Sequence, residues 1–173
     1  MADSRRFYER GLEAATTGPR RAAALEGLGS LAQSEGRLLD AVQHVEEAAA
    51  LHRADGNVRG AAVAGGNLGL VQLELGRIDD GRRALERARA GFLSVGDEVG
   101  ATVVLGNLGI VDLIEGRVRD GAEKYRQVVA SVRASGLRRR EAIWLGNLGG
   151  VLVDLGEREE ASTRSASTLA TVG

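Results

Sequence analysis

Apolar and small side chains recur at helical spacing along most of the chain. Residues 78–94 show the pattern clearly, because their apolar and small positions fall on one side of a helix: Ile78, Gly81, Leu85, Ala88 and Phe92. No stretch shows the strict alternation of apolar and polar residues that is typical of a strand. The sequence therefore predicts an all-α chain, with helices near 1–17, 20–35, 38–54, 58–75, 78–94, 98–115, 118–134, 138–155 and 158–171.

Every second helix of this series is apolar on two sides. On a wheel of about 100° per residue, one side of residues 58–75 carries Ala64, Leu68, Val71 and Leu75. The opposite side carries Val63, Gly66, Asn67, Leu70 and Glu74. A helix with two apolar sides is flanked by neighbours or presents one side to a partner.

The chain repeats itself with a fixed period. Gly66-Asn67-Leu68-Gly69 returns forty positions later as Gly106-Asn107-Leu108-Gly109, and again as Gly146-Asn147-Leu148-Gly149. Glycines that mark a turn follow the same interval: Gly36, Gly76, Gly116 and Gly156. This spacing predicts four units of two helices at about 20–57, 58–97, 98–137 and 138–173, after an extra helix in residues 1–19 that is a cap or half repeat.

Small residues at fixed offsets extend the pattern. Leu-Gly pairs occur at Leu28-Gly29, Leu68-Gly69, Leu108-Gly109 and Leu148-Gly149. Small residues stand thirteen positions after the Leu, at Ala41, Gly81, Gly121 and Ala161. The next motif positions, seven residues on, are Ala48, Ala88, Val128 and Thr168, so the match weakens toward the C-terminus.

With these residues the chain resembles the tetratricopeptide-repeat (TPR) family, in its forty-residue subclass found in kinesin light chains and bacterial regulatory proteins. A repeat of this length also fits HEAT or armadillo proteins, but the Leu-Gly pairs and small residues favour TPR. The resemblance implies a right-handed α-solenoid of four helical hairpins. It also implies a non-enzymatic module that binds a peptide segment or a protein partner in a concave groove.

The asparagines at the equivalent positions 67, 107 and 147 are the main candidates for contact with a ligand. The resemblance places Asn67, Asn107 and Asn147 along the concave surface, where an amide can both donate to and accept from a peptide backbone. Alternatively, each Asn bonds to a neighbouring helix and only fixes the repeat spacing. Aliphatic residues flank this line and form an apolar strip unless tight curvature buries them: Val63, Leu70, Val103, Ile110, Ile114 and Ile143.

Glycines inside the predicted helices need an explanation, because each destabilises a helix by about 1 kcal/mol relative to Ala. The resemblance assigns Gly69, Gly109 and Gly149 to close contact between helices. Gly66, Gly106 and Gly146 leave room for a neighbouring helix or for a ligand.

Composition narrows the function classes. A net charge of −1 gives no field that favours nucleic acid or a membrane surface, and the absence of Cys removes thiolate metal sites and Cys nucleophiles. His44 and His52 stand too far apart to share a metal, and no catalytic set or phosphate loop is present, so we expect no enzyme activity, no metal and no cofactor. With no signal peptide or apolar span, we expect a cytoplasmic protein, and the excess of Arg over Lys suggests a bacterial source.

Other classes of function stay open. The chain could be a self-assembling repeat unit, or the sensor segment of a larger bacterial regulator. Arg138-Arg139-Arg140 forms a solvated face or meets an acidic partner, and the polar helix at 158–171 is a cap or the end of a cut fragment. We expect Phe7 and Leu12 to anchor the first helix and Trp144 to lie in the core.

Overall fold

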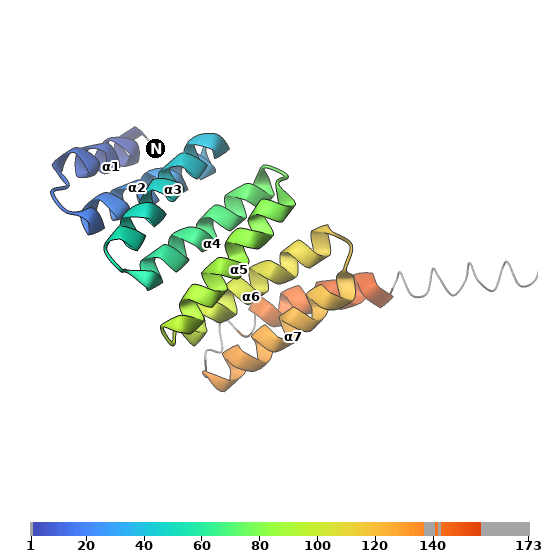
Figure 1. The fold of residues 1–173 in the computed structure, drawn as a ribbon. Helices are drawn as coiled ribbons and strands as arrows, with labels where there is room; N and C mark the ends of the chain where they lie inside the picture. Colours follow the sequence, from blue (N-terminus) through green and yellow to red (C-terminus); the bar gives the residue numbers. More distant parts are fainter. Residues whose placement is uncertain (1, 137–140, 142, 157–173) are drawn as a thin grey trace, which may run out of the picture. The chain divides into compact units, whose positions relative to one another are not determined.

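The computed structural model describes residues 2–136, 141 and 143–156, and all regular structure in them is helical (Figure 1). The helices are α1 (Ala2–Ala14), α2 (Gly18–Ser34), α3 (Leu38–Ala54), α4 (Val58–Glu74), α5 (Ile78–Ser94), α6 (Glu98–Ile114) and α7 (Val118–Ala134). Residues 143–156 are helical as well. The expected all-α fold is confirmed, whereas Arg138-Arg139-Arg140 and the helix expected at 158–171 lie outside the described residues.

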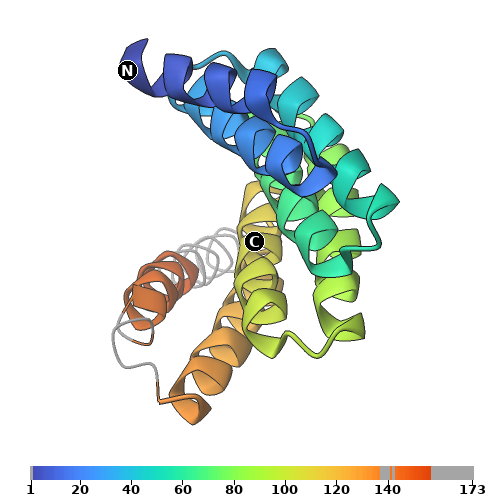
Figure 2. The ribbon, with the colours of Figure 1, turned by 90° about the vertical axis from the view of Figure 1, so that its left-hand side faces the viewer.

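The same tight turn ends successive helices. Each helix from α2 to α7 has 17 residues, and glycines with φ between 67° and 77° follow them: Gly36, Gly56, Gly76, Gly96, Gly116 and Gly136. After α4, the N–H of Gly76 donates to the carbonyl of Leu73 and the N–H of Arg77 to that of Gln72, both at 2.9 Å. This bond pair is the Schellman motif, which requires a left-handed residue that glycine adopts without strain. Short turns of this kind make α2 with α3, and α4 with α5, antiparallel pairs (Figures 1 and 2).

The first helix is shorter than the sequence suggested. It ends at Ala14 rather than residue 17, and α2 begins at Gly18, two residues earlier than expected. Thr17 is extended, with φ −132° and ψ 151°, and Pro19 lies in the first turn of α2. Proline suits a first turn because its missing N–H would have no helical partner there.

The chain forms two compact units, Met1–Asn107 and Leu108–Gly173. In the first unit, clusters of buried small and aliphatic side chains join neighbouring helices. One cluster holds α1, α2 and α3 together through Leu12, Ala22, Leu25, Ala48 and Leu51. A second cluster joins α2, α3 and the end of α4 through Ala32, Leu38, Ala41, Val42, Val71 and Leu75. A third joins α3 and α4 through Val45, Ala49, Ala64 and Leu68.

The prediction for the first helix is right for Leu12 and wrong for Phe7. Leu12 packs in the cluster with Ala22 and Leu25, but the Phe7 side chain is 71% exposed. Tyr8 instead lies against α2, where a side chain at Gly27 would collide with its ring. One residue along a helix turns the side chain by about 100°, so Tyr8 and Leu12 face α2 while Phe7 points away from it.

In the second unit, α7 and residues 143–156 share a core. Its buried members are Val118, Ala122, Tyr125 and Val151, with Leu113, Trp144, Leu148 and Leu155 packed against them. The rings of Tyr125 and Trp144 meet edge to face with centroids 5.4 Å apart, and burial raises the pKa of Tyr125. The predicted core position of Trp144 is therefore confirmed.

The Leu-Gly glycines allow close helix contact, as expected, in α4 and α6. A Cβ at Gly69 would lie 2.7 Å from Leu85 Cγ, and one at Gly109 would lie 2.7 Å from Tyr125 Cε1. At Gly149 no described atom lies within 4 Å of such a Cβ, and the equivalent partner positions, 161 and 165, lie outside the described residues, so this contact stays a prediction. Gly66 meets its neighbour: a Cβ there would lie 3.8 Å from Val104 Cγ2, so α4 and α6 touch at this point. At Gly146 no described atom lies within 4 Å.

Candidate functional site

Asn67 and Asn107 occupy equivalent positions on α4 and α6 of the first unit. Both residues are half-buried, and contact between Gly66 and Val104 joins their helices one residue before Asn67. Asn147 belongs to the second unit, where it is exposed on the helix of residues 143–156.

The amides of Asn67 and Asn107 have unused bonding capacity. Within the described residues, neither side chain forms a hydrogen bond, although each amide can donate twice and accept at its oxygen. Neither amide is among the fully buried polar groups without a partner, so its nitrogen and oxygen still reach solvent. Bonding to a neighbouring helix does not account for these two asparagines in the described structure.

The flanking aliphatic side chains differ in exposure between the helices. Val63 and Leu70 on α4 are half-buried, whereas the exposed fractions of Val103, Ile110, Ile114 and Ile143 range from 37% to 57%. Burial by tight curvature is therefore wrong for these four side chains. Val103 stands with Asn107 in the first unit, and Ile110, Ile114 and Ile143 stand in the second.

On α4, polar residues border the apolar positions of this face. Arg59, Val63, Asn67, Leu70 and Glu74 follow one side of the helix, because their spacings of three and four residues match the helical turn. We call these five residues the α4 face. Its centre is aliphatic with one amide, and its ends carry opposite charges.

Both charged ends of the α4 face are tied to neighbouring segments, one to the turn before α6 and the other to α2. Arg59 Nε donates to Asp97 Oδ2 at 2.7 Å, and Gln33 Nε2 on α2 donates to Glu74 Oε1 at 2.5 Å. The Gly100 N–H, which donates to Asp97 Oδ1 at 2.8 Å, and then Arg59 lower the pKa of Asp97. These bonds hold the rim of the face in place, while the Asn67 amide at its centre keeps unused hydrogen-bonding capacity.

Another polar cluster surrounds His52 at the junction of α3 and α4. The described residues contain no group of three His, Asp or Glu side chains that could hold a metal ion. His52 is buried, with its Nε2 3.1 Å from Glu26 Oε1 and its Nδ1 3.2 Å from Asn57 Nδ2. The Asn57 side chain also accepts from the Gly60 N–H at 2.8 Å, so this network fixes the junction of α3 and α4. Among the described helices, none has the length and apolar character that a membrane crossing needs.

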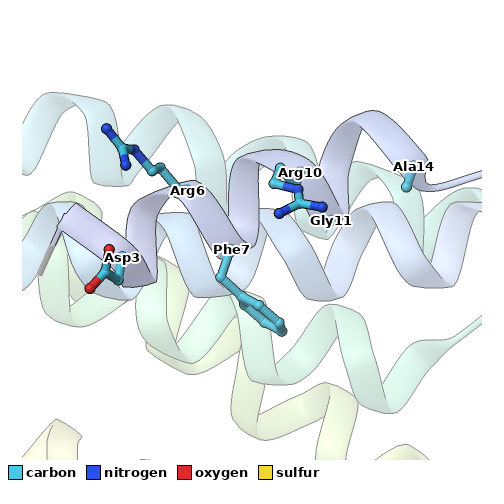
Figure 3. Close-up of a pocket in the computed structure, with 6 residues that line it drawn as sticks. All are labelled: Asp3, Arg6, Phe7, Arg10, Gly11 and Ala14. Atoms are coloured by element: carbon cyan, nitrogen blue, oxygen red, sulfur yellow. The ribbon is translucent and has the colours of Figure 1, made fainter.

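Sequence reasoning missed two hollows of the first unit. One lies between α3, α4 and α5. Alignment of the repeats could have indicated it, because Gly65 replaces a leucine found in the other units. The other is a surface hollow of α1, lined by Asp3, Arg6, Phe7, Arg10, Gly11 and Ala14 (Figure 3). From the sequence, we expect its aromatic side chain, Phe7, to be an apolar anchor of the first helix.

Comparison with known proteins supports the fold. The chain matches no protein-family profile and no curated protein sequence. Among solved structures, aspartyl phosphate phosphatase F from Bacillus subtilis is similar with a TM-score of 0.72 and 16% identity, over 86% of this chain and 38% of that one. This chain therefore spans well under half the length of the phosphatase.

Two similar structures cover more of their own chains. BtubC (BKLC) from P. vanneervenii has a TM-score of 0.64 and 14% identity, over 90% of this chain and 72% of that one. The nearly identical TPR-like repeats of a Podosopora anserina kinesin light chain candidate have a TM-score of 0.59 and 15% identity. The match covers 87% of this chain and 84% of that one. At such identities the likeness concerns the fold, and the chain has a TPR-like helical-repeat solenoid fold.

Proposed function

We propose that the chain is a non-catalytic scaffold that binds an extended peptide segment of a partner protein along the α4 face and its counterpart on α6. The observation that carries the proposal is the pair of half-buried amides, Asn67 and Asn107, that reach solvent without a partner in the described structure. Half-buried amides without partners are suited to ligand contact, because a ligand can supply the missing hydrogen bonds.

The chemistry of the face fits a peptide backbone. An amide side chain can donate to a backbone carbonyl and accept from a backbone N–H at the same time, whatever side chains the peptide carries. Val63, Leu70 and Val103 stand beside these amides and offer apolar area for alternate side chains of the peptide. Asn147 and Ile143 hold the equivalent repeat positions in the second unit, and Ile110 and Ile114 add exposed aliphatic area there. By repeat equivalence, we propose that these four residues contact a ligand within the second unit, taken by itself.

A display library of random linear peptides tests the proposal. Peptides selected on the wild-type chain are measured by calorimetry against the double variant Asn67→Ala, Asn107→Ala. Loss of two amides, each worth about 0.5–1.5 kcal/mol, should weaken binding about tenfold. The matched control is Gln43→Ala, which removes an exposed amide from α3 away from this face. Equal affinity of the double variant and the control would refute the proposal, and so would the failure of any peptide to bind.

Self-association is a second candidate, favoured by the exposed Phe7 on α1. An aromatic side chain with 71% of its surface in solvent, beside a hollow that includes Gly11 and Ala14, can pack against another copy (Figure 3). Light scattering at rising concentration separates the candidates. A dimer that dissociates in the Phe7→Ser variant supports self-association, and a monomer at every concentration excludes it.

A further inference from the structure

A pocket of about 230 Å³ lies between α3, α4 and α5 of the first unit. Its lining includes Ala61, Ala62 and Gly65 of α4 and Ala88 and Gly91 of α5. A Cβ at Gly65 would lie 3.6 Å from Ala88 Cβ, and one at Gly91 would lie 3.1 Å from Ala62 Cβ, so α4 and α5 are in close contact at these two positions.

The pocket lies where one repeat lacks a leucine that the others carry. Forty residues before and after Gly65 stand Leu25 and Leu105, and Leu145 follows at the next interval. Leu25 is 1% exposed, so at its own position the leucine fills the interior. Gly91 likewise occupies the position of Leu51 in the preceding unit. Gly65 thus leaves out a leucine side chain, whereas Gly91 packs tightly, because a Cβ there would lie 3.1 Å from Ala62 Cβ.

Two cations border this apolar hollow without partners. Arg53, in the last turn of α3, and Arg87, on α5, both line the pocket and are exposed. Neither forms an ion pair or a side-chain hydrogen bond with any described residue, although other arginines such as Arg59 and Arg83 do so. No Asp or Glu is among the residues that line the pocket. The pocket thus combines an apolar floor with positive charge.

We propose that this pocket binds a small organic carboxylate with an apolar body of one ring or a short chain. Cavities of about 150 Å³ hold benzene, whereas drug-sized ligands occupy roughly 300–1,000 Å³, so the volume here suits a molecule between these sizes. A guanidinium binds a carboxylate by charge-assisted hydrogen bonds, and Arg53 and Arg87 supply that contact at the rim.

This site is separate from the α4 face. Gly65 and Asn67 are two residues apart on one helix, which places their side-chain directions about 200° from each other. A ligand in the pocket and a peptide on the α4 face therefore contact different sides of α4, and the two proposals can fail independently.

Phenylacetate is the probe, and amide NMR shifts of the ¹⁵N-labelled chain are the readout. We expect saturable shifts confined to residues around Gly65, Ala88 and Gly91. Acetate has the charge without the ring, and 2-phenylethanol has the ring without the charge. Each should bind at least tenfold more weakly than phenylacetate. The proposal is wrong if phenylacetate causes no shifts there, or if the neutral alcohol binds as tightly.

Matched variants test the location. Gly65→Leu restores the residue of the other repeats and should abolish binding, whereas Gly65→Ala, which adds one methyl group at an ordinary contact distance, should keep it. The double variant Arg53→Gln, Arg87→Gln changes only exposed side chains and should weaken binding about tenfold with an unchanged melting temperature. Unchanged affinity of the Gly65→Leu variant for phenylacetate refutes the site. If that variant does not fold, unchanged affinity of the Arg53→Gln, Arg87→Gln variant refutes it. Shifts in the pocket caused by a peptide but not by phenylacetate would make it a protein-docking surface and also refute the proposal.

Discussion

The guanidinium of Arg117 lies 2.6 Å from the carboxylate of Asp112, which is only 1% exposed. Arg117 follows the turn after α6, and Lys124 on α7 donates to the other carboxylate oxygen of Asp112. The hydrogen bond to Asp112 is the largest of the contacts that raise the pKa of Arg117. The buried carboxylate thus ties the end of α6 to α7 within the second unit.

Asp112→Ala should destabilise the protein by about 2 kcal/mol. The variant removes charge-assisted hydrogen bonds worth about 1.5–3 kcal/mol in such sites, but it leaves no buried charge, because both cations are partly exposed. Urea unfolding measures the change. Asp120→Ala is the control, since its exposed carboxylate lies 3.7 Å from Arg117 Nε and should contribute little. Equal losses in the two variants would show that the buried carboxylate has no special role.

Gly65 and Gly69 should respond to Ala in opposite directions, although they stand one turn apart on α4. At Gly65 the added Cβ meets Ala88 Cβ at 3.6 Å, an ordinary contact, and helix propensity should stabilise the variant by about 1 kcal/mol. At Gly69 the Cβ would lie 2.7 Å from Leu85 Cγ and 3.1 Å from the Gly81 carbonyl oxygen, so α4 and α5 must separate. We expect a net loss of about 1–2 kcal/mol there. Thermal unfolding of the Gly65→Ala and Gly69→Ala variants measures both changes in stability. Stabilisation by both substitutions would contradict the close contact between Gly69 and Leu85.

The turns and helices could be predicted because the residues that encode them act locally. Gly76 and Gly116 terminate the preceding helices through their own left-handed backbone conformation. The expected bounds of α3, α5 and α7 agree with the structure. Asp112 could not be predicted in its role. The equivalent positions hold Ala32, Gln72 and Leu152, and an acidic residue on a helix ordinarily faces water.

The candidate site was predictable in its residues but not in its exposure. The repeat places Asn67 and Asn107 in equivalent positions, yet only the packing of neighbouring helices determines that their amides reach solvent. Phe7 shows the same limit, because its apolar character says nothing about which side of α1 meets α2. To predict the pocket beside Gly65, one has to compare the repeats and notice that this one has glycine where the others have leucine.

Gly76→Ala should destabilise the protein by about 1–2 kcal/mol, because Gly76 has φ 74° and the left-handed region is unfavourable for a residue with a Cβ. No atom of the described residues lies within 4 Å of the added Cβ, so the effect reports the backbone conformation. Gly76→Asn should lose less, since Asn enters this region more readily. Denaturant unfolding ranks the stabilities of the wild-type chain and the two variants. An Asn variant less stable than the Ala variant would argue against backbone strain as the cause.

Asp97 should make stability depend on acidity. The Gly100 N–H and Arg59 hold its pKa below the ordinary 3.8, so the folded state favours the carboxylate. A lowered folded pKa means that this contribution is fully present above the ordinary value and is lost as the pH falls through the folded value.

The difference in melting temperature between the wild-type chain and Asp97→Asn should therefore stay constant from about pH 7 to about pH 5 and shrink below about pH 3. Circular dichroism at a series of pH values measures it. Arg59→Gln is the control, because it removes the ion pair but keeps the Gly100 bond and should preserve part of the acid dependence. A difference that stays the same down to about pH 2 would mean that the Asp97 charge contributes nothing beyond what a neutral amide provides in the same cap.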